Sequence, residues 1–406
     1  MKVCYLCKKE SVIELIDFGR QPVAHRFLSS KQEAEYSGSV VLGQCQNCAL
    51  IQQLMPMPIE ELVARYGWLT RNEPERHLDD LVQTLTKLPG IAKKSYIWGV
   101  SWKEDTTLER LKKLGYENTY RLQIDQDLSV RDPLADIEIV QDRLTYAKSQ
   151  EIVARHGRAD IVIARHLIEH VYSVPEFLRA LKNLLKPNGF LVLEIPDCRL
   201  SMEYLDYTTI WEELVLYFTP TTFQSCFAYG GFELVDFIEE EYSLENSYIG
   251  IARIADRAVE PVLDTQTLQE ELARGSRFAG QFEVRRQEIR VSLENFKKNH
   301  GKIAIFGAAH MCCAFLNLMQ VQDLIEFAVD DNPHKKGMFM PGVRLPIRGS
   351  KDLIEQGIKL CLLTLSVANE EIVLKKNQEF VDRGGIFKSI FPRNARAFIK
   401  ADSKTV

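Results

Sequence analysis

Short apolar runs recur along most of the chain, and segments of helical periodicity separate them. Strands are predicted at 96–100, 160–164, 190–195, 233–237, 247–254, 302–306, 360–365 and 387–391. The runs at 160–164, 190–195 and 360–365 are apolar on both faces, which is typical of strands buried inside a sheet that is covered by helices. Amphipathic segments lie between them at 58–66, 75–88, 106–114, 146–155, 175–185, 221–229, 311–319 and 369–379. This alternation predicts α/β architecture with doubly wound, mostly parallel sheets.

The stretch from Ser95 to Asp125 has the order of a nucleotide-binding unit. A strand at 96–100 leads through a polar turn into a helix, and a second strand is expected to end at Asp125. In such a unit the helix N-terminus offers unpaired N–H groups to a ligand, and an acid after the second strand can bond a ribose hydroxyl. The turn from Ser101 to Asp105, however, contains no glycine. A further short strand is predicted at 137–140.

A second unit of the same kind begins at 302. Its strand runs into the small residues Gly307-Ala308-Ala309 and then His310, where a helix begins. This turn alone is a weak motif, but a strand at 327–329 that ends in Asp330 and Asp331, followed by Lys336, strengthens it. A charged helical segment at 264–299 joins this unit to the preceding one.

Four of the nine cysteines fall in the first 48 residues, in two CxxC pairs. Cys4 with Cys7, and Cys45 with Cys48, would each present two thiolates on one tight turn, and together they predict a closed, structural Cys4 zinc site. Four unrelated buried cysteines, or two redox motifs, are the alternatives. Tyr66 and Trp68 follow this module; they either line a pocket or pack in a domain core.

Composition limits the classes of function. The chain has 406 residues, 46% hydrophobic and 26% charged, with a formal net charge of −5. Two or three domains are expected. No dense basic stripe indicates nucleic-acid binding. No run is long and apolar enough for a membrane span, and no signal-peptide pattern is found. An odd number of cysteines without such a signal favours a reducing, cytoplasmic setting.

Five markers occur in the order found in one enzyme family: Cys4/Cys7, the segment DFGRQP at 17–22, Cys45/Cys48, RHLIEH at 165–170 followed by FLRALKNLLKPNGFLVLEIPD, and the GAAH turn. On these, the chain resembles the three-domain S-adenosylmethionine-dependent C-methyltransferases that act on nucleotide-linked keto-deoxysugars. The resemblance implies a zinc-binding module at 1–66, a class I methyltransferase-like domain at 67–256 and a C-terminal Rossmann-like nucleotide-sugar domain at 257–406.

The resemblance also implies roles for particular residues. The donor, S-adenosylmethionine, would lie against Ser101, Asp105, Asp125, Asp142 and His166, and the sugar nucleotide against Trp68, His170, Gly307, His310, Asp330 and Lys336. The chain departs from the family at the donor turn: Ser101 and Asp105 stand where the family has glycines, and Gly99 stands where it has an acid. A side chain at a glycine position blocks the approach of a ligand or the required backbone angles.

The segment YTTIWEELVLYF at 207–218 departs as well. Family members carry Y-H-E-H-x-x-Y-F here, whereas this chain has neither histidine and retains Glu213 and Tyr217. The base that removes the proton beside the ketone would then be Glu212, Glu213 or His166. Tyr217 and Tyr66 are the other candidate catalytic residues. Alternatively the glutamates are solvated, and His166 and His170 are core histidines.

Three hypotheses remain: a sugar C-methyltransferase, a nucleotide-sugar epimerase or isomerase that has lost the donor, and a non-catalytic partner subunit of an enzyme of the same pathway.

Overall fold

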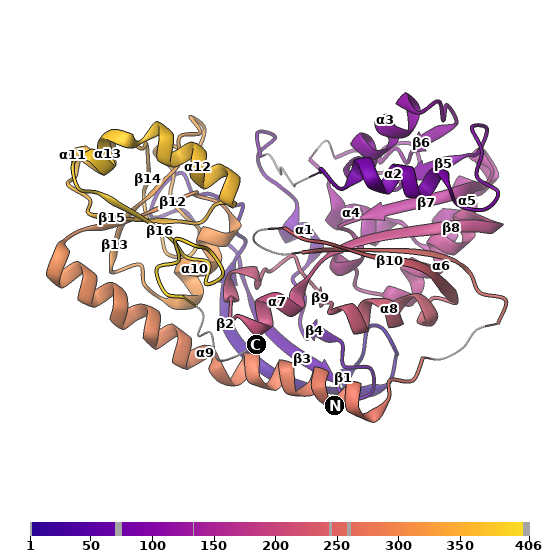
Figure 1. Ribbon diagram of the computed structural model, residues 1–406, viewed down its shortest axis with the longest axis horizontal. Coiled ribbons are helices and arrows are strands. Elements are labelled where there is room, and N and C mark those ends of the chain that lie inside the picture. Colours follow the sequence, from indigo (N-terminus) through magenta and orange to yellow (C-terminus); the bar gives the residue numbers. More distant parts are fainter. Residues whose placement is uncertain (1, 70–74, 133, 243–245, 258–260, 401–406) are drawn as a thin grey trace.

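The computed structural model describes residues 2–69, 75–132, 134–242, 246–257 and 261–400. In these ranges the chain forms three sheets, and a 36-residue helix, α9 (Thr265–His300), runs along one side of the molecule (Figure 1). The central and C-terminal sheets lie on opposite sides in this view, and the N-terminal strands lie between and below them.

The N-terminal sheet is antiparallel and has the order β1 (Lys2–Val3), β2 (Glu10–Pro22), β3 (Ser37–Cys45), β4 (Ile51–Gln53) and β9 (Leu216–Tyr217). Its last strand comes from far along the chain, since Ile51 pairs with Tyr217. The N-terminal sheet therefore includes a strand from beyond the boundary predicted at residue 66. The division into three domains remains a proposal.

The central sheet has the order β10 (Phe232–Glu240), β11 (Ser247–Ile254), β8 (Leu185–Pro196), β7 (Ala159–Arg165), β5 (Ile97–Gly99) and β6 (Thr119–Arg121). The last four strands are parallel, and β10 and β11 are antiparallel additions. The predicted mostly parallel sheet is confirmed. The strand expected to end at Asp125 ends at Arg121.

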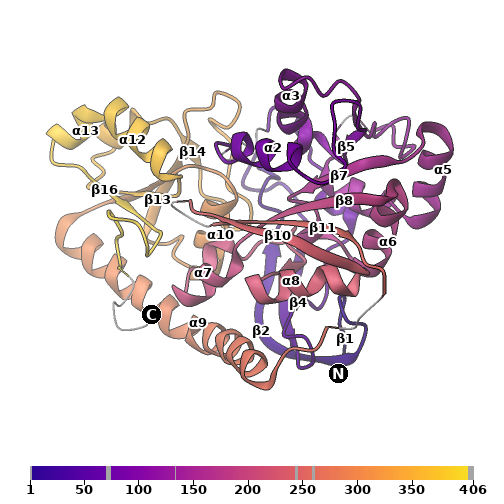
Figure 2. The ribbon, with the colours of Figure 1, turned by 45° about the vertical axis from the view of Figure 1, so that its right-hand side comes forward.

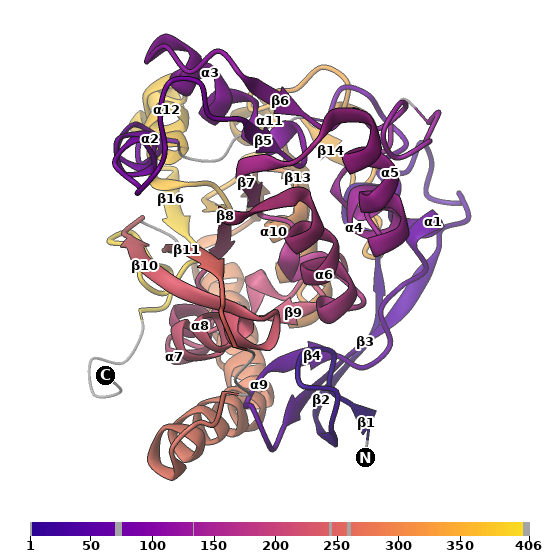
Figure 3. The same ribbon diagram turned by 90° about the vertical axis from the view of Figure 1, so that its right-hand side faces the viewer.

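Helices cover both faces of this sheet (Figure 3). Along β7, Ile161 and Ile163 pack with α2 (Leu78–Thr86) and α3 (Asp105–Lys113), whereas Val162 and Ala164 pack on the side of α5 (Tyr146–His156) and α6 (Val174–Leu184). This period-two division explains why the strand sequence is apolar throughout. Beneath β11 lies α8 (Pro220–Tyr229).

The strand predicted at 137–140 is wrong: α4 (Ile137–Arg143) is a helix. The side chain of Asp136 accepts a hydrogen bond from the Ile137 amide and caps its start. Ile137, Val140 and Leu144 are all buried. Their spacing of three and four residues is that of a helix face, which a window of four residues is too short to reveal.

The C-terminal sheet is parallel, in the order β14 (Ile347–Arg348), β13 (Ile325–Val329), β12 (Ile303–Phe306), β15 (Leu360–Leu363) and β16 (Ile386–Ser389). Its helices are α10 (His310–Met319), α11 (Asp352–Glu355), α12 (Val367–Lys376) and α13 (Gln378–Asp382). Figure 2 labels α10, α12 and α13, and Figure 1 also labels α11.

Helix α9 fastens the N-terminal sheet to the C-terminal domain. Near its start the Glu271 carbonyl accepts a hydrogen bond from the buried Gln44 of β3. Further along, Arg290 forms an ion pair with Asp323, and Leu293 is buried in the same apolar cluster as Ile303. None of the described helices combines the length and the apolar character that a membrane crossing requires.

Candidate functional site

The two CxxC pairs converge, as predicted. The Sγ atoms of Cys4 and Cys48 are 3.6 Å apart, and those of Cys7 and Cys45 are also 3.6 Å apart. A tetrahedral site with Zn–S bonds of about 2.3 Å has S–S edges of about 3.8 Å. Cys4, Cys45 and Cys48 are buried and Cys7 is partly exposed. The four thiols therefore fit a closed structural zinc site.

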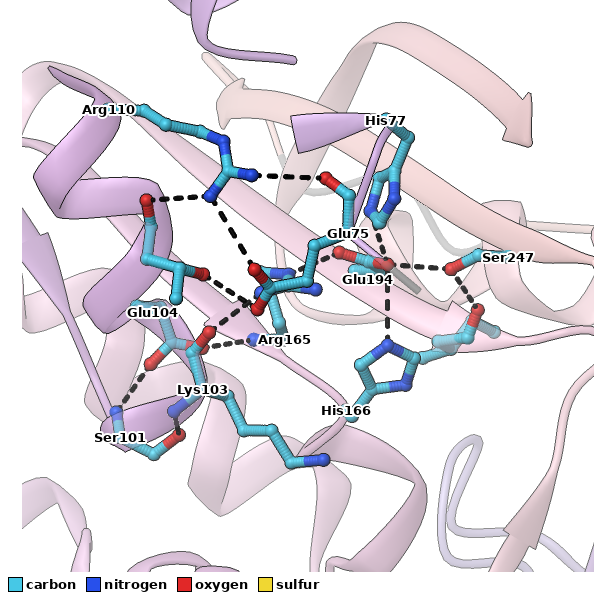
Figure 4. A network of polar contacts seen from close by, with 12 residues as sticks. Glu75, His77, Ser101, Lys103, Glu104, Arg110, Arg165, His166, Glu194 and Ser247 are labelled. Atoms are coloured by element: carbon cyan, nitrogen blue, oxygen red, sulfur yellow. Dashed lines mark hydrogen bonds and ion pairs between the residues drawn. The ribbon is translucent and has the colours of Figure 1, made fainter. Parts of the chain in front are cut away.

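A buried polar network occupies the carboxyl edge of the central sheet (Figure 4). We call it the edge network; it consists of His77, Glu104, Arg165, His166, Glu194 and Ser247. Arg165 ends β7 and Glu194 stands opposite it on β8, and their side chains form an ion pair through Nε. Both are essentially inaccessible to solvent.

Glu194 collects most of the donors of the network. Its Oε1 lies 2.8 Å from His77 Nε2, 3.3 Å from His166 Nε2 and 2.8 Å from Ser247 Oγ. Burial alone would raise the pKa of Glu194, but the Arg165 guanidinium and the two imidazoles hold the pKa well below its usual range. His166 adopts a left-handed backbone conformation, with φ +48°, at the end of the strand.

Glu104 closes the turn after β5. Its carboxylate accepts hydrogen bonds from the Ser101 amide and, at 2.7 Å, from the Arg165 amide. Burial raises the pKa of Glu104 to about 7, although these amides and the Arg165 guanidinium favour the charged form. A Cβ at Gly99 would lie 2.6 Å from the Glu104 Cβ. The glycine therefore makes room for the chain's own glutamate.

The residues proposed to hold the donor are spread around this edge. Ser101 caps the 3-10 turn η1 (Trp102–Glu104) by accepting from the Lys103 amide. Asp105 opens α3 and pairs with Arg121, Asp125 is exposed beyond β6, and the exposed Asp142 pairs with Arg143 on α4. Of these residues, His166 belongs to the edge network, and the Ser101 amide donates to Glu104 of that network.

In this arrangement the edge does not fit the donor in the way a glycine-rich turn would. The amides of Ser101 and Arg165 both point at Glu104, and Arg165 Nη1 donates to the Lys103 carbonyl at 2.7 Å. The backbone groups at which a donor would be held are thus already bonded within the chain.

The predicted base segment lies where β9 meets the N-terminal module. Gln53 of β4 is fully buried and donates to the carbonyls of Trp211, Glu212 and Leu214. Glu212 and Glu213 are 5% and 3% exposed, so they are not solvated helix residues. Burial, with the neighbouring Glu213, raises the pKa of Glu212 to about 8.

Groups from all three predicted domains surround these glutamates. The Nδ1 atom of His25, in the loop after β2, lies 2.9 Å from Glu213 Oε1. His170 Nδ1 donates to the Glu213 carbonyl at 2.8 Å. The His310 ring of α10 stacks on Trp211, with centroids 4.3 Å apart. We call His25, His170, Trp211, Glu212, Glu213 and His310 the junction cluster.

The hydroxyl groups of Tyr217 and Tyr66 contact backbone groups. Tyr217 is buried in β9, with its hydroxyl 3.4 Å from the backbone of Trp211, and burial raises its pKa. Tyr66 donates to the Phe27 carbonyl at 2.9 Å. These positions favour structural roles. Trp68 stacks between Tyr66 and His334 of the C-terminal domain, at centroid distances of 5.0 and 5.5 Å.

The C-terminal turn packs closely against the chain's own Leu365 and Thr364. Gly307 has φ +103°, and a Cβ there would lie 2.6 Å from the Leu365 side chain. Asp330, after β13, bonds Lys335 Nζ at 2.9 Å, and the same ammonium donates to the Ala308 carbonyl at 2.7 Å. Lys336, the predicted site residue, is exposed and 3.8 Å from Asp331, whereas its neighbour Lys335 is the lysine at the turn.

Sequence reasoning also missed Glu194 and His25. Glu194 lies inside an apolar strand run, where an isolated acid was the only signal. His25 follows the DFGRQP marker by three residues, and the loss of both histidines at 211–214 was the sole hint that another segment supplies one.

Comparisons with known proteins match the three parts of the chain separately. Residues 4–62 match a zinc binding domain, residues 107–236 a methyltransferase domain, and residues 255–392 a C-methyltransferase C-terminal domain. The methyltransferase match begins after the turn that Glu104 closes. These matches support zinc and S-adenosylmethionine as the cofactors.

Among curated proteins, the chain is similar to the C-methyltransferase NovU of Streptomyces niveus, with 23% identity over 98% of this chain and 97% of that protein. Among solved structures, similar ones include a methyltransferase from Aquifex aeolicus (15% identity, 48% of this chain and 97% of that chain, TM-score 0.30). Another is the 1,6-didemethyltoxoflavin-N1-methyltransferase of Burkholderia thailandensis (11%, 51% and 96%, TM-score 0.34). These TM-scores are too low to carry an argument.

The matches follow one another in the order that the five sequence markers predicted, and together they reach from residue 4 to residue 392. The similarity to the curated C-methyltransferase extends over almost the whole length of both chains. The chain is therefore a C-methyltransferase with a zinc-binding domain, a methyltransferase domain and a C-methyltransferase C-terminal domain.

Proposed function

We propose that this C-methyltransferase acts on a nucleotide-linked keto-deoxysugar and removes a proton from the carbon beside the ketone. The electron pair of the broken C–H bond becomes an enolate, whose carbon is the nucleophile. S-adenosylmethionine supplies the methyl group when bound. A neighbouring base and a water-poor environment are what this deprotonation requires of the protein.

The junction cluster is the observation that carries the proposal. It brings two buried carboxylates and three imidazoles together where the loop after β2, the segment before β9 and the start of α10 meet. Titratable groups with displaced pKa values gather at functional sites, and Glu212 is such a group.

The turn after β12 favours a nucleotide as the part of the substrate held by the C-terminal domain. The turn holds the small residues Gly307, Ala308 and Ala309, and α10 begins two residues beyond Ala308 with no side-chain cap. Lys335 Nζ stands at the same turn. Small residues, a helix start and a cation are a common combination for binding phosphates. His310, at the first position of α10, connects this turn to the junction cluster.

The test is incubation with thymidine diphosphate-linked 4-keto-6-deoxyglucose and S-adenosylmethionine, followed by mass spectrometry of the sugar. A product with a methyl group in place of a carbon-bound hydrogen is expected. Calorimetry with S-adenosylhomocysteine gives the second measurement, with micromolar binding expected. Absence of both binding and methylation would reject methyl transfer.

One observation favours a second candidate. Glu104 bonds the two amides at the edge of the central sheet, so deprotonation without methylation, that is epimerisation or isomerisation of the same substrate, is the alternative. In that case nucleotide-sugar binding would be retained while S-adenosylhomocysteine does not bind.

We further propose a cytoplasmic location and no nucleic-acid partner. A four-thiolate zinc site is stable in a reducing compartment, and the net charge of −5 offers no general attraction for phosphate backbones. A partner enzyme of the same pathway, and roles for the remaining predicted site residues, stay as proposals.

A further inference from the structure

A histidine of the zinc-binding module lies against the segment in which the resemblance places the base. The His25 side chain is 11% exposed, and its Nδ1 is 2.9 Å from Oε1 of Glu213, whose side chain is 2% exposed. His25, Glu212 and Glu213 each offer a ligand or proton-binding atom, and these atoms all lie within 4.8 Å of one another.

The loop that carries His25 is held on both sides. The Ala24 amide donates to Glu212 Oε1 at 2.6 Å. Arg26 forms an ion pair with Glu61 at 2.6 Å and donates to the Glu60 carbonyl. Val23 and Phe27 are buried in the apolar cluster that the N-terminal and C-terminal domains share. The histidine is thus fixed in place and not on a free loop.

Glu213 is fixed as firmly. Gln53 holds the carbonyls on either side of it, and His170 Nδ1 donates to its own carbonyl. A carboxylate against Nδ1 favours the tautomer with its hydrogen on Nδ1, which leaves a lone pair on Nε2.

Both ring nitrogens of His25 are buried, and neither forms a hydrogen bond of good geometry with the described residues; Nδ1 has the Glu213 carboxylate 2.9 Å away, whereas Nε2 has no such neighbour among them. A buried polar nitrogen without a partner is costly and uncommon in folded proteins, and it marks either a water or a ligand position. The charge balance also suits a base. Glu212 carries its proton at neutral pH, because burial and Glu213 raise its pKa to about 8. One carboxylate, Glu213, then remains to stabilise an imidazolium.

We propose that His25 is the catalytic base of this protein and that Glu213 is its positioning residue. This inference rests on the proposed function. His25 replaces, from a different domain, the histidines absent from the segment at 211–214. Its Nε2 takes the proton from the carbon beside the ketone, the C–H electron pair passes into the enolate, and the ketone oxygen takes the negative charge. In heavy water the imidazolium returns a deuteron to the same carbon.

The experiment measures deuterium incorporation into thymidine diphosphate-linked 4-keto-6-deoxyglucose in heavy water, without methyl donor, with the full-length zinc-loaded protein. Methyl transfer is measured in parallel. His25→Ala and the near-isosteric His25→Gln are expected to exchange about 10²- to 10⁴-fold more slowly. Added imidazole should restore exchange to His25→Ala, and Glu213→Gln should slow exchange without being restored. His300→Asn, at an exposed histidine on the last turn of α9, is the matched control with unchanged rates.

The outcomes separate the two proposals. Exchange by the native protein and by both His25 variants overturns the base assignment and leaves the proposed function intact. A loss in His25→Ala that imidazole does not restore, with a lowered melting temperature, assigns His25 a structural role. A second tightly bound metal that is lost from His25→Gln makes His25 a metal ligand and also overturns the assignment. No exchange and no methylation by the native protein rejects the proposed function and the base together.

Discussion

Replacing Glu194 by glutamine should be among the most destabilising single changes in the central domain. The amide keeps the shape of the carboxylate but leaves the buried Arg165 guanidinium without its ion-pair partner, and it turns an N–H group toward one of the former donors. Four donors now converge on Glu194 at the edge of the sheet. Removing one partner of a buried pair costs about 3–5 kcal/mol, most of it from the charge left behind.

Arg165→Met should cost less, because Glu194 retains His77, His166 and Ser247 as partners. The contribution of Glu194 in the native protein depends on pH. Because the pKa of Glu194 is depressed, its contribution is present above its unfolded pKa of about 4.3 and is lost as the pH falls toward the folded pKa.

Scanning calorimetry resolves this, since the domains of a long chain can unfold in separate transitions. Glu233→Gln is the matched control, because Glu233 pairs with Arg253 in the same sheet but both side chains are more than half exposed; its transition should not move. The double variant Arg165→Met/Glu194→Gln should recover part of the loss of Glu194→Gln. Strictly additive losses, or a Glu194→Gln protein as stable as the control, would refute the assigned role of the buried pair.

Three further predictions follow from the fold. Cys7→Ser should lose bound zinc and melt earlier, whereas Cys361→Ala, at a buried cysteine of β15, keeps its metal; atomic emission measures both. Gly275→Ala should weaken the packing of α9, because the added Cβ would lie 2.4 Å from the Gln44 side chain of β3. Gly280 has open space around it, so Gly280→Ala should stabilise the helix by up to about 1 kcal/mol. Thermal melting measures both effects. The pKa of Glu104 is raised to about 7, so its contribution to native stability falls as the pH rises from about 4.3 to 7. The melting temperature of Glu104→Gln should therefore lie below that of the native protein by an amount that shrinks over this range. A constant difference would contradict the raised pKa.

Much of the fold was predictable from local pattern. Strands such as β7 and β15 are apolar on both faces because helices cover both sides of their sheets. The segment at 137–140 was misread because its sequence, Ile-Glu-Ile-Val, is too short to distinguish the period of a strand from that of a helix. The pairing of β4 with β9 was invisible, since two-residue β9 has no periodicity of its own.

The site was predictable where chemistry is local and unpredictable where it is not. Two CxxC pairs carry their geometry in their spacing, so the thiol cluster was found at once. The contact of His25 with Glu213 joins residues from different domains, and the bonds of Glu104 to two amides depend on a turn shape that only the structure gives. The family resemblance located both segments in the sequence, but it did not indicate that Glu213 contacts His25 or that Glu104 bonds two amides.

The short strand β9 has a consequence for synthesis of the protein on the ribosome. Strands β1 to β4 are made first and can gather their metal early, but the edge of β4 has no neighbour until Tyr217 has emerged. Until then an unpaired strand edge and the amide of Gln53 are open to other chains. A nascent chain that stalls before β9 would present this edge as a site for aggregation, and a shortened protein without the first 66 residues would leave the segment at 211–215 without the side chain that holds it.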